Sequence, residues 1–110
     1  MRGNQGSRRW PLRVFRVVED SMRPALKPGD LVLGFRGGAP SVGQLRVFRD
    51  PSKSTRWLVK RVGDVYVGTT STTFEARSDN PRARGAVDSD EFGPISAGGS
   101  YRVIWTLGAR

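Results

Sequence analysis

The sequence predicts an all-β domain, built as a small twisted β-sheet or a partly open barrel. Fourteen glycines and seven prolines in 110 residues divide the chain into short pieces, which favours strands joined by turns over long helices. Several of these pieces alternate apolar and polar side chains, as half-buried strands do. With 36% apolar residues the chain can form one modest core. We therefore expect one domain over residues 10–110, preceded by a flexible basic tail over residues 1–9.

Seven segments have the pattern of strands, namely residues 12–18, 31–35, 45–49, 56–62, 65–67, 72–76 and 101–107. In the first, Phe15, Val17 and Glu19 should share one face, while Val14, Arg16 and Val18 share the other. Gly63-Asp64 should turn the chain between the fourth segment and the fifth. Residues 22–26 predict no more than a turn or two of helix, and residues 78–94 predict a long ordered loop.

Composition excludes several kinds of chemistry. The chain has no cysteine and no histidine, so we expect no disulfide, no thiol catalysis, no metal site of the common zinc type and no cofactor. The net charge of +9, from 19 basic and 10 acidic residues, would attract an acidic protein, anionic lipid or nucleic acid. No apolar run approaches the roughly 18–20 residues that span a bilayer. We expect a cytoplasmic protein, free or peripheral at the membrane.

Ser21 is a candidate nucleophile because of its setting. It follows an apolar strand, Pro24 restricts the backbone after it, and Pro28-Gly29-Asp30 forces a turn into the next strand. Backbone N–H groups at such a strand end can face a developing oxyanion. The alternative is a serine that caps a short helical turn, with Met22 and Leu26 in the core.

A lysine would have to replace the usual histidine as the base that activates Ser21. Lys27 lies within the turn and Lys53 in the exposed loop Asp50–Ser54, whereas Lys60 shares a strand face with Leu58 and Val62. Among apolar side chains, desolvation should lower the pKa of the Lys60 amine. The alternative is a lysine whose amine extends along the surface to water.

Three blocks in order resemble those of type I signal peptidases. They are Ser21-Met22-x-Pro24-x-Leu26-x-x-Gly29-Asp30, then Lys60-Arg61-Val62-Gly63-Asp64, then Ser78-Asp79-Asn80 followed by Asp88-Ser89-x-x-x-Gly93-Pro94. The resemblance implies the β-fold shared by signal peptidases and self-cleaving repressors. It also implies a serine endopeptidase with a Ser21–Lys60 dyad, which cleaves a protein precursor after small residues.

The resemblance also assigns supporting roles. The Ser21 N–H would help to hold the oxyanion, and Arg61, Asp79, Asp88 and Ser89 would support the site. The substrate pockets would be lined by apolar side chains: Phe15, Val17, Met22, Leu26, Val32, Leu58 and Val59. Three positions depart from the family pattern. Glu19 places a carboxylate near the oxyanion, Ala86 replaces a serine that orients the lysine, and Asp90 replaces an arginine.

The short chain, with no expected anchor, is similar to maturation proteases of nickel superoxide dismutase, which remove an N-terminal extension from a cytoplasmic precursor. A signal peptidase that docks on anionic membrane through its basic surface is the alternative. A self-cleaving repressor domain would normally carry a DNA-binding segment, for which nine residues are too few. A nucleic-acid-binding β-barrel explains the charge but not the three blocks, so nucleic acid is not expected as the partner. A peptidase fold used only for binding is consistent with Glu19, Ala86 and Asp90.

Overall fold

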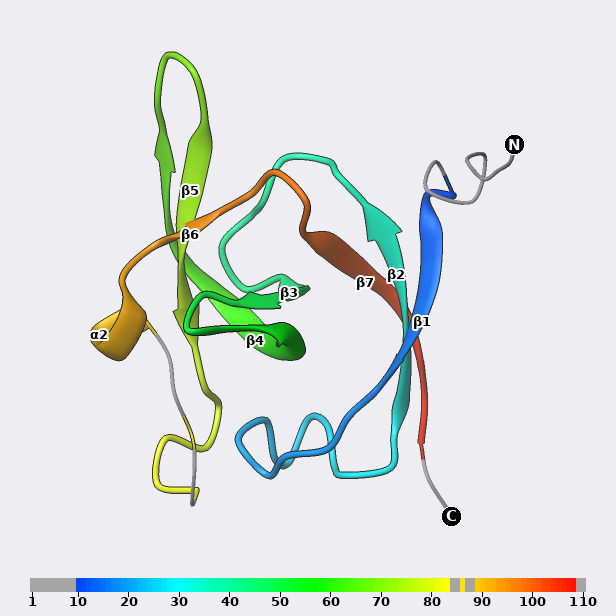
Figure 1. Ribbon diagram of the computed structural model, residues 1–110. Helices are drawn as coiled ribbons and strands as arrows, with labels where there is room; N and C mark the ends of the chain where they lie inside the picture. The colour runs from blue at the N-terminus through cyan, green and yellow to red at the C-terminus, as the bar shows by residue number, and fades with distance from the viewer. Residues whose placement is uncertain (1–9, 84–85, 87–88, 109–110) are drawn as a thin grey trace.

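The computed structural model describes residues 10–83, 86 and 89–108. Seven strands in this part of the chain form one antiparallel sheet (Figure 1). The strand order is β1-β2-β7-β3-β4-β5-β6. The elements are β1 (Leu12–Arg16), β2 (Leu31–Arg36), β3 (Leu45–Asp50), β4 (Lys53–Val67), β5 (Thr72–Arg77), α2 (Ser89–Phe92), β6 (Ile95–Ser96) and β7 (Tyr101–Leu107). β1 and β6 are the two edges of this sheet, so it does not close into a barrel. The all-β prediction is confirmed.

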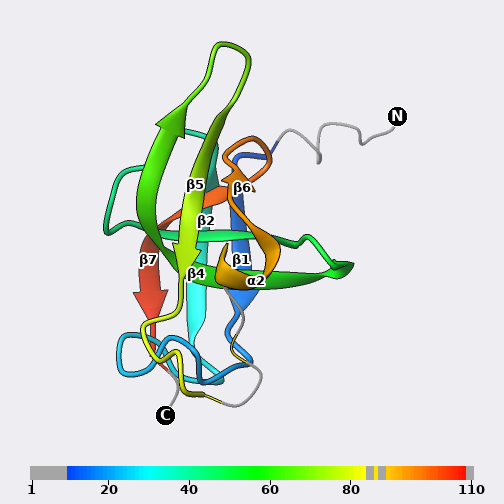
Figure 2. The ribbon, with the colours of Figure 1, turned by 90° about the vertical axis from the view of Figure 1, so that its left-hand side faces the viewer.

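β4 differs from the prediction because Gly63-Asp64 does not turn the chain. The pairing of β4 with β5 instead shifts register between Val62 and Val65, so the two residues form an irregularity within one strand of 15 residues. A bulge of this kind absorbs extra residues without ending the ladder. β4 and β5 together form a hairpin that projects from the rest of the sheet (Figure 2).

The ends of two other predicted elements also differ. β1 ends at Arg16 rather than at residue 18, because the backbone of Val17 bonds the turn before β2: its N–H donates to Asp30 O at 2.8 Å, and its carbonyl accepts from Gly29 N at 2.7 Å. The predicted loop over residues 78–94 contains the single turn of α2, and β6 follows it. The expected tail, residues 1–9, lies outside the described residues.

Apolar side chains form two core clusters, and β3 and β4 contribute to both sides of the fold. The first cluster contains Phe15, Val17, Met22, Leu26, Val32, Val47 and Tyr101. The second contains Phe48, Leu58, Val62, Phe74, Ala76 and Ile95. The predicted alternation in the first strand is confirmed, since Phe15 and Val17 are buried whereas Val14 and Val18 are exposed. The first cluster is the one that anchors the Ser21 segment.

An exposed apolar face was not predicted. Val14, Trp105 and Leu107 are 60%, 62% and 53% exposed, and they line one hollow together with Leu31, Val32 and Leu33. Apolar patches of this kind often mark interaction surfaces. Within the described residues, no helix is long and apolar enough to cross a membrane.

Candidate active site

The segment between β1 and β2 presents Ser21 on an anchored turn. Met22 and Leu26 are buried in the first core cluster, and Leu26 N–H donates to Met22 O at 2.8 Å, which closes one helix-like turn. This turn and the strand-end bonds of Val17 fix the backbone on both sides of Ser21. Met22 and Leu26 are therefore core residues, as the alternative interpretation expected, and Ser21 lines the cleft described below.

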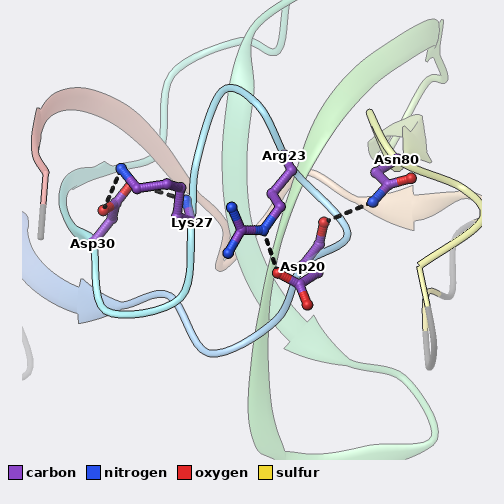
Figure 3. Close-up of polar contacts among 5 residues, drawn as sticks. All are labelled: Asp20, Arg23, Lys27, Asp30 and Asn80. Carbon is purple, nitrogen blue, oxygen red and sulfur yellow. Dashed lines mark hydrogen bonds and ion pairs between the residues drawn. The ribbon is translucent and has the colours of Figure 1, made fainter.

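Polar contacts hold the same segment from outside (Figure 3). Asp20 forms an ion pair with Arg23, and Asn80 Nδ2 donates to Asp20 O at 3.3 Å. Lys27 N–H donates to Asp30 Oδ2 at 2.9 Å, and the Lys27 amine lies 3.7 Å from Asp30 Oδ1. The Lys27 amine thus pairs with a carboxylate of its own turn, which agrees with its rejection as the base.

Ser21 and Lys60 meet in the interior. Lys60 Nζ lies 2.9 Å from Ser21 Oγ, although the two residues are 39 positions apart. Lys60 is 0% exposed and Ser21 is 3% exposed. Leu58 and Val62, on the same face of β4, are also buried, so the amine does not extend to water. A hydroxyl and a buried amine at this distance are within the range needed for direct proton transfer.

Ser78 is a second hydroxyl at the amine; the third sequence block contains this serine, but its contact with the lysine was not predicted. Ser78 Oγ lies 2.9 Å from Lys60 Nζ. Ser78 follows the last residue of β5, Arg77, which pairs with Arg61 beside Lys60. The pairing of two predicted strands was therefore the signal that could have located it. Ala86 has no hydroxyl with which to orient the lysine, and Ser78 supplies one from a different position.

The residues after Ser78 connect the two halves of the site. Asn80 N–H donates to Ser21 O at 2.7 Å, so this segment lies directly beside the Ser21 turn. Arg61 Nε and Nη2 donate to the two carboxylate oxygens of Asp79 at 3.0 and 2.8 Å. These hydrogen bonds raise the pKa of Arg61, and two-point pairing of this kind fixes orientation as well as distance. Arg61 and Asp79, two of the residues expected to support the site, thus pair with each other, and this pairing holds Ser78 near Lys60.

A narrow cleft opens at Ser21. It is lined by Phe15, Arg16, Val17, Val18, Glu19, Ser21, Met22, Val32, Val47, Trp57, Leu58 and Val59. Six of the seven predicted pocket residues are in this set. Leu26 is not, because it packs into the core beneath the turn. Lys60 is also absent from the lining, so the hydroxyl faces the cleft and the amine lies behind it.

The carboxylate of Glu19 is neutralised rather than directed at the nucleophile. Glu19 forms an ion pair with Arg56, which also lies 3.9 Å from Asp50. The Ser21 N–H has no hydrogen-bond acceptor among the described residues. Asp88 lies outside the described residues, as do the side chains of Ser89 and Asp90.

The arrangement places a hydroxyl, a buried amine and a backbone N–H beside a cleft, which are groups that acyl-transfer chemistry can use. Within the described residues, no group of three or more carboxylates could hold a metal ion. Comparison with known proteins adds no relative, since no family model, curated protein or solved structure matches this chain.

Proposed function

We propose that the protein is a serine endopeptidase that uses a Ser21–Lys60 dyad to remove an N-terminal leader or pro-segment from a protein precursor. The observation that carries this proposal is the 2.9 Å contact between Ser21 Oγ and a fully buried Lys60 amine. The chain has no histidine or cysteine that could act instead. The resemblance of the three sequence blocks to type I signal peptidases supports the same activity.

In this mechanism Ser21 Oγ attacks the scissile carbonyl carbon and its proton passes to the neutral Lys60 amine. The carbonyl oxygen becomes an oxyanion that the Ser21 N–H stabilises. Collapse of the intermediate breaks the C–N bond, and the Lys60 ammonium returns the proton to the leaving amine. Lys60 then takes a proton from water, whose oxygen attacks the ester carbonyl carbon. The bond from this carbon to Ser21 Oγ breaks, Lys60 returns the proton to Ser21 Oγ, and the new acid leaves and loses its own proton to solvent.

Burial of Lys60 supports its role as a base. An amine that is removed from water favours its neutral form, because burial penalises the ammonium ion. Ser78 Oγ gives that amine a second hydroxyl contact at 2.9 Å, which holds Nζ toward Ser21. A neutral and oriented amine is what the first proton transfer requires.

The backbone edges beside the cleft support an extended peptide as the substrate. The walls of the cleft are residues 15–19, which continue edge strand β1, and residues 57–59 of β4. β5 pairs with β4 only from Arg61 onward, so residues 57–59 bond β3 alone among the described strands. An added strand can hydrogen-bond to such free edges. The space inside the cleft is about 30 Å³, which favours small side chains next to the cleaved bond.

Two substrate classes fit this activity. The resemblance to maturation proteases of nickel superoxide dismutase favours a cytoplasmic precursor, whose N-terminal extension would be removed. The exposed apolar face formed by Val14, Trp105 and Leu107 favours the second class, precursors processed at a membrane surface.

A peptide library tests the proposal. The purified protein is incubated with a proteome-derived library, and mass spectrometry identifies the new N-termini, with Ser21→Ala as the control. We expect alanine or glycine before the cut and a small or aliphatic residue two positions earlier. A preference for arginine, lysine or a large aromatic residue before the cut would contradict the pocket assignment.

A further inference from the structure

A second cleft adjoins the first and has a different chemical character. Its lining is Trp10, Leu12, Arg13, Arg36, Arg49, Trp57, Gly99 and Tyr101. Three of these eight residues are arginines, three are aromatic and none is acidic. Its volume of about 550 Å³ lies in the range of ligand-binding clefts. This combination suits a ligand that carries negative charge.

The arginines are held against aromatic rings. The guanidinium carbon of Arg49 lies 4.3 Å from the centre of the Trp57 ring, and that of Arg13 lies 4.8 Å from the same ring. A guanidinium that stacks on a ring still presents N–H donors at its edges. Arg49 Nη1 donates one hydrogen bond to Ser54 O at 2.7 Å, which leaves further donors on the same group. The stacked side chains are thus positioned in advance for a carboxylate.

The two clefts share a wall. Trp57 lines both of them. Phe15, in the wall of the first, packs against Trp57 at 5.1 Å and against Tyr101, in the wall of the second, also at 5.1 Å. β1 borders both clefts, with Phe15 in one and Leu12 and Arg13 in the other. An extended chain that follows β1 away from Ser21 therefore passes from the first cleft, which we call the apolar cleft, into the second, which we call the arginine cleft.

We propose that the arginine cleft binds an acidic segment of the substrate on one side of the cleaved bond. This inference rests on the proposed endopeptidase function. Arg13 precedes Ser21 by eight positions, and an added strand pairs with its neighbour residue by residue. The acidic residues should therefore lie about five to eight residues from the cleaved bond. The net charge of +9 would also speed the approach of such a segment.

Arginine and aromatic side chains together can also bind single-stranded nucleic acid. The shared wall with the apolar cleft favours a peptide, because one extended chain can occupy both clefts at once. Nucleic acid would use the second cleft alone. When the apolar cleft is already occupied, binding of an acidic peptide that spans both clefts should therefore weaken, whereas binding of a nucleic acid should not.

The test measures binding without cleavage, so it does not depend on activity. Fluorescence anisotropy of the Ser21→Ala protein is recorded with two labelled peptides that share an alanine-rich core. The first peptide carries glutamate at the positions five to eight residues from the expected cleavage site, on its N-terminal side in one version and on its C-terminal side in another. The second peptide carries glutamine at the same positions. The measurement is repeated after Arg13→Gln, after Arg49→Gln and after Arg82→Gln. Arg82→Gln is the matched control, because it removes the same charge from an exposed residue outside both clefts.

We expect the glutamate peptide to bind about tenfold more tightly than the glutamine peptide on one side of the core, and Arg13→Gln or Arg49→Gln each to remove about two- to fivefold of that preference. Arg82→Gln should leave it unchanged. Equal binding of the two peptides, or an equal loss with all three variants, would overturn the proposal. A single-stranded oligonucleotide that displaces the glutamate peptide, while the alanine-rich core alone does not, would assign the cleft to nucleic acid instead.

If the glutamate preference appears but the wild-type protein cleaves neither peptide, the acidic-peptide cleft stands and the endopeptidase proposal fails. If both peptides are cleaved at equal rates and bound equally, the endopeptidase proposal stands and the acidic-segment proposal fails. The two proposals are therefore separable in one set of measurements.

Discussion

Replacement of Ser78 by alanine tests whether this hydroxyl positions the Lys60 amine. Ser78 and Ser21 each place an oxygen 2.9 Å from Lys60 Nζ, so Ser78→Ala removes one of these two contacts. A hydrogen bond of this kind contributes about 0.5–1.5 kcal/mol. If that energy serves only to hold the amine toward Ser21, kcat should fall by about two- to twelvefold while KM changes little.

The assay is steady-state cleavage of a fluorogenic peptide with alanine before the cut, followed from pH 6 to pH 10. Ser78→Thr keeps the hydroxyl and should recover most of the rate, and Ser41→Ala removes an exposed hydroxyl elsewhere as the control. Thermal unfolding of each variant shows whether the fold is intact. An unchanged rate in Ser78→Ala, a loss confined to KM, or an equal loss in Ser78→Thr would refute the positioning role.

Three further predictions concern pH, packing and charge. Because the reaction needs neutral Lys60, activity should rise with pH through the alkaline range; a pH–rate profile that stays flat or falls over this range would contradict the role of Lys60 as the base. Gly34→Ala should destabilise the fold by about 1–3 kcal/mol in chemical denaturation, because the new Cβ would lie 2.8 Å from Tyr101 Cβ; a loss under about 0.5 kcal/mol would show that the strands adjust. Co-sedimentation with anionic vesicles should weaken as salt increases, because the net charge of +9 supplies the attraction; salt-independent binding that Trp105→Ser abolishes would assign the contact to the apolar face instead.

The strand pattern could be predicted because side chains at successive positions of a half-buried strand are alternately buried and exposed. Phe15 and Val17 are buried and Val14 and Val18 exposed, as the period of two requires. The continuity of β4 through Gly63-Asp64 was not predictable in the same way. A glycine followed by an aspartate is compatible with either a turn or a bulge, and the pairing with β5 decides between them.

The sequence predicted only those residues of the candidate site whose role is indicated by their neighbours in the chain. Ser21 and Lys60 each have a distinctive local context, but the Ser78 hydroxyl acquires its position from the pairing of Arg61 with Arg77. The arginine cleft likewise depends on tertiary contacts, since Arg13 and Arg49 are far apart in sequence and meet at Trp57. Long-range contacts of this kind have no signal in a single sequence.

A buried charge was also beyond prediction. Arg46 lies on β3 among apolar neighbours and is 0% exposed. Its guanidinium donates to Ser100 Oγ, Gln44 Oε1 and the carbonyl oxygens of Gly37 and Gly38 at 2.8–3.1 Å. Burial is the main cause that lowers the pKa of Arg46, and the charge of Arg102 lowers it further. Alternation with Leu45 and Val47 would place this position outside, and only the fold shows that it is buried and which acceptors make the burial tolerable.

The most direct test of the central claim compares cleavage by the wild-type protein with cleavage by Ser21→Ala and by Lys60→Met. Methionine keeps most of the volume of the buried lysine side chain while removing the amine, and circular dichroism with thermal unfolding checks that each variant is folded. We predict that both variants lose at least about 10³-fold in kcat/KM, and that acid-quenched wild-type protein shows by intact mass an acyl fragment on Ser21 that both variants lack. Cleavage by either folded variant within about tenfold of the wild-type rate would contradict the Ser21–Lys60 dyad.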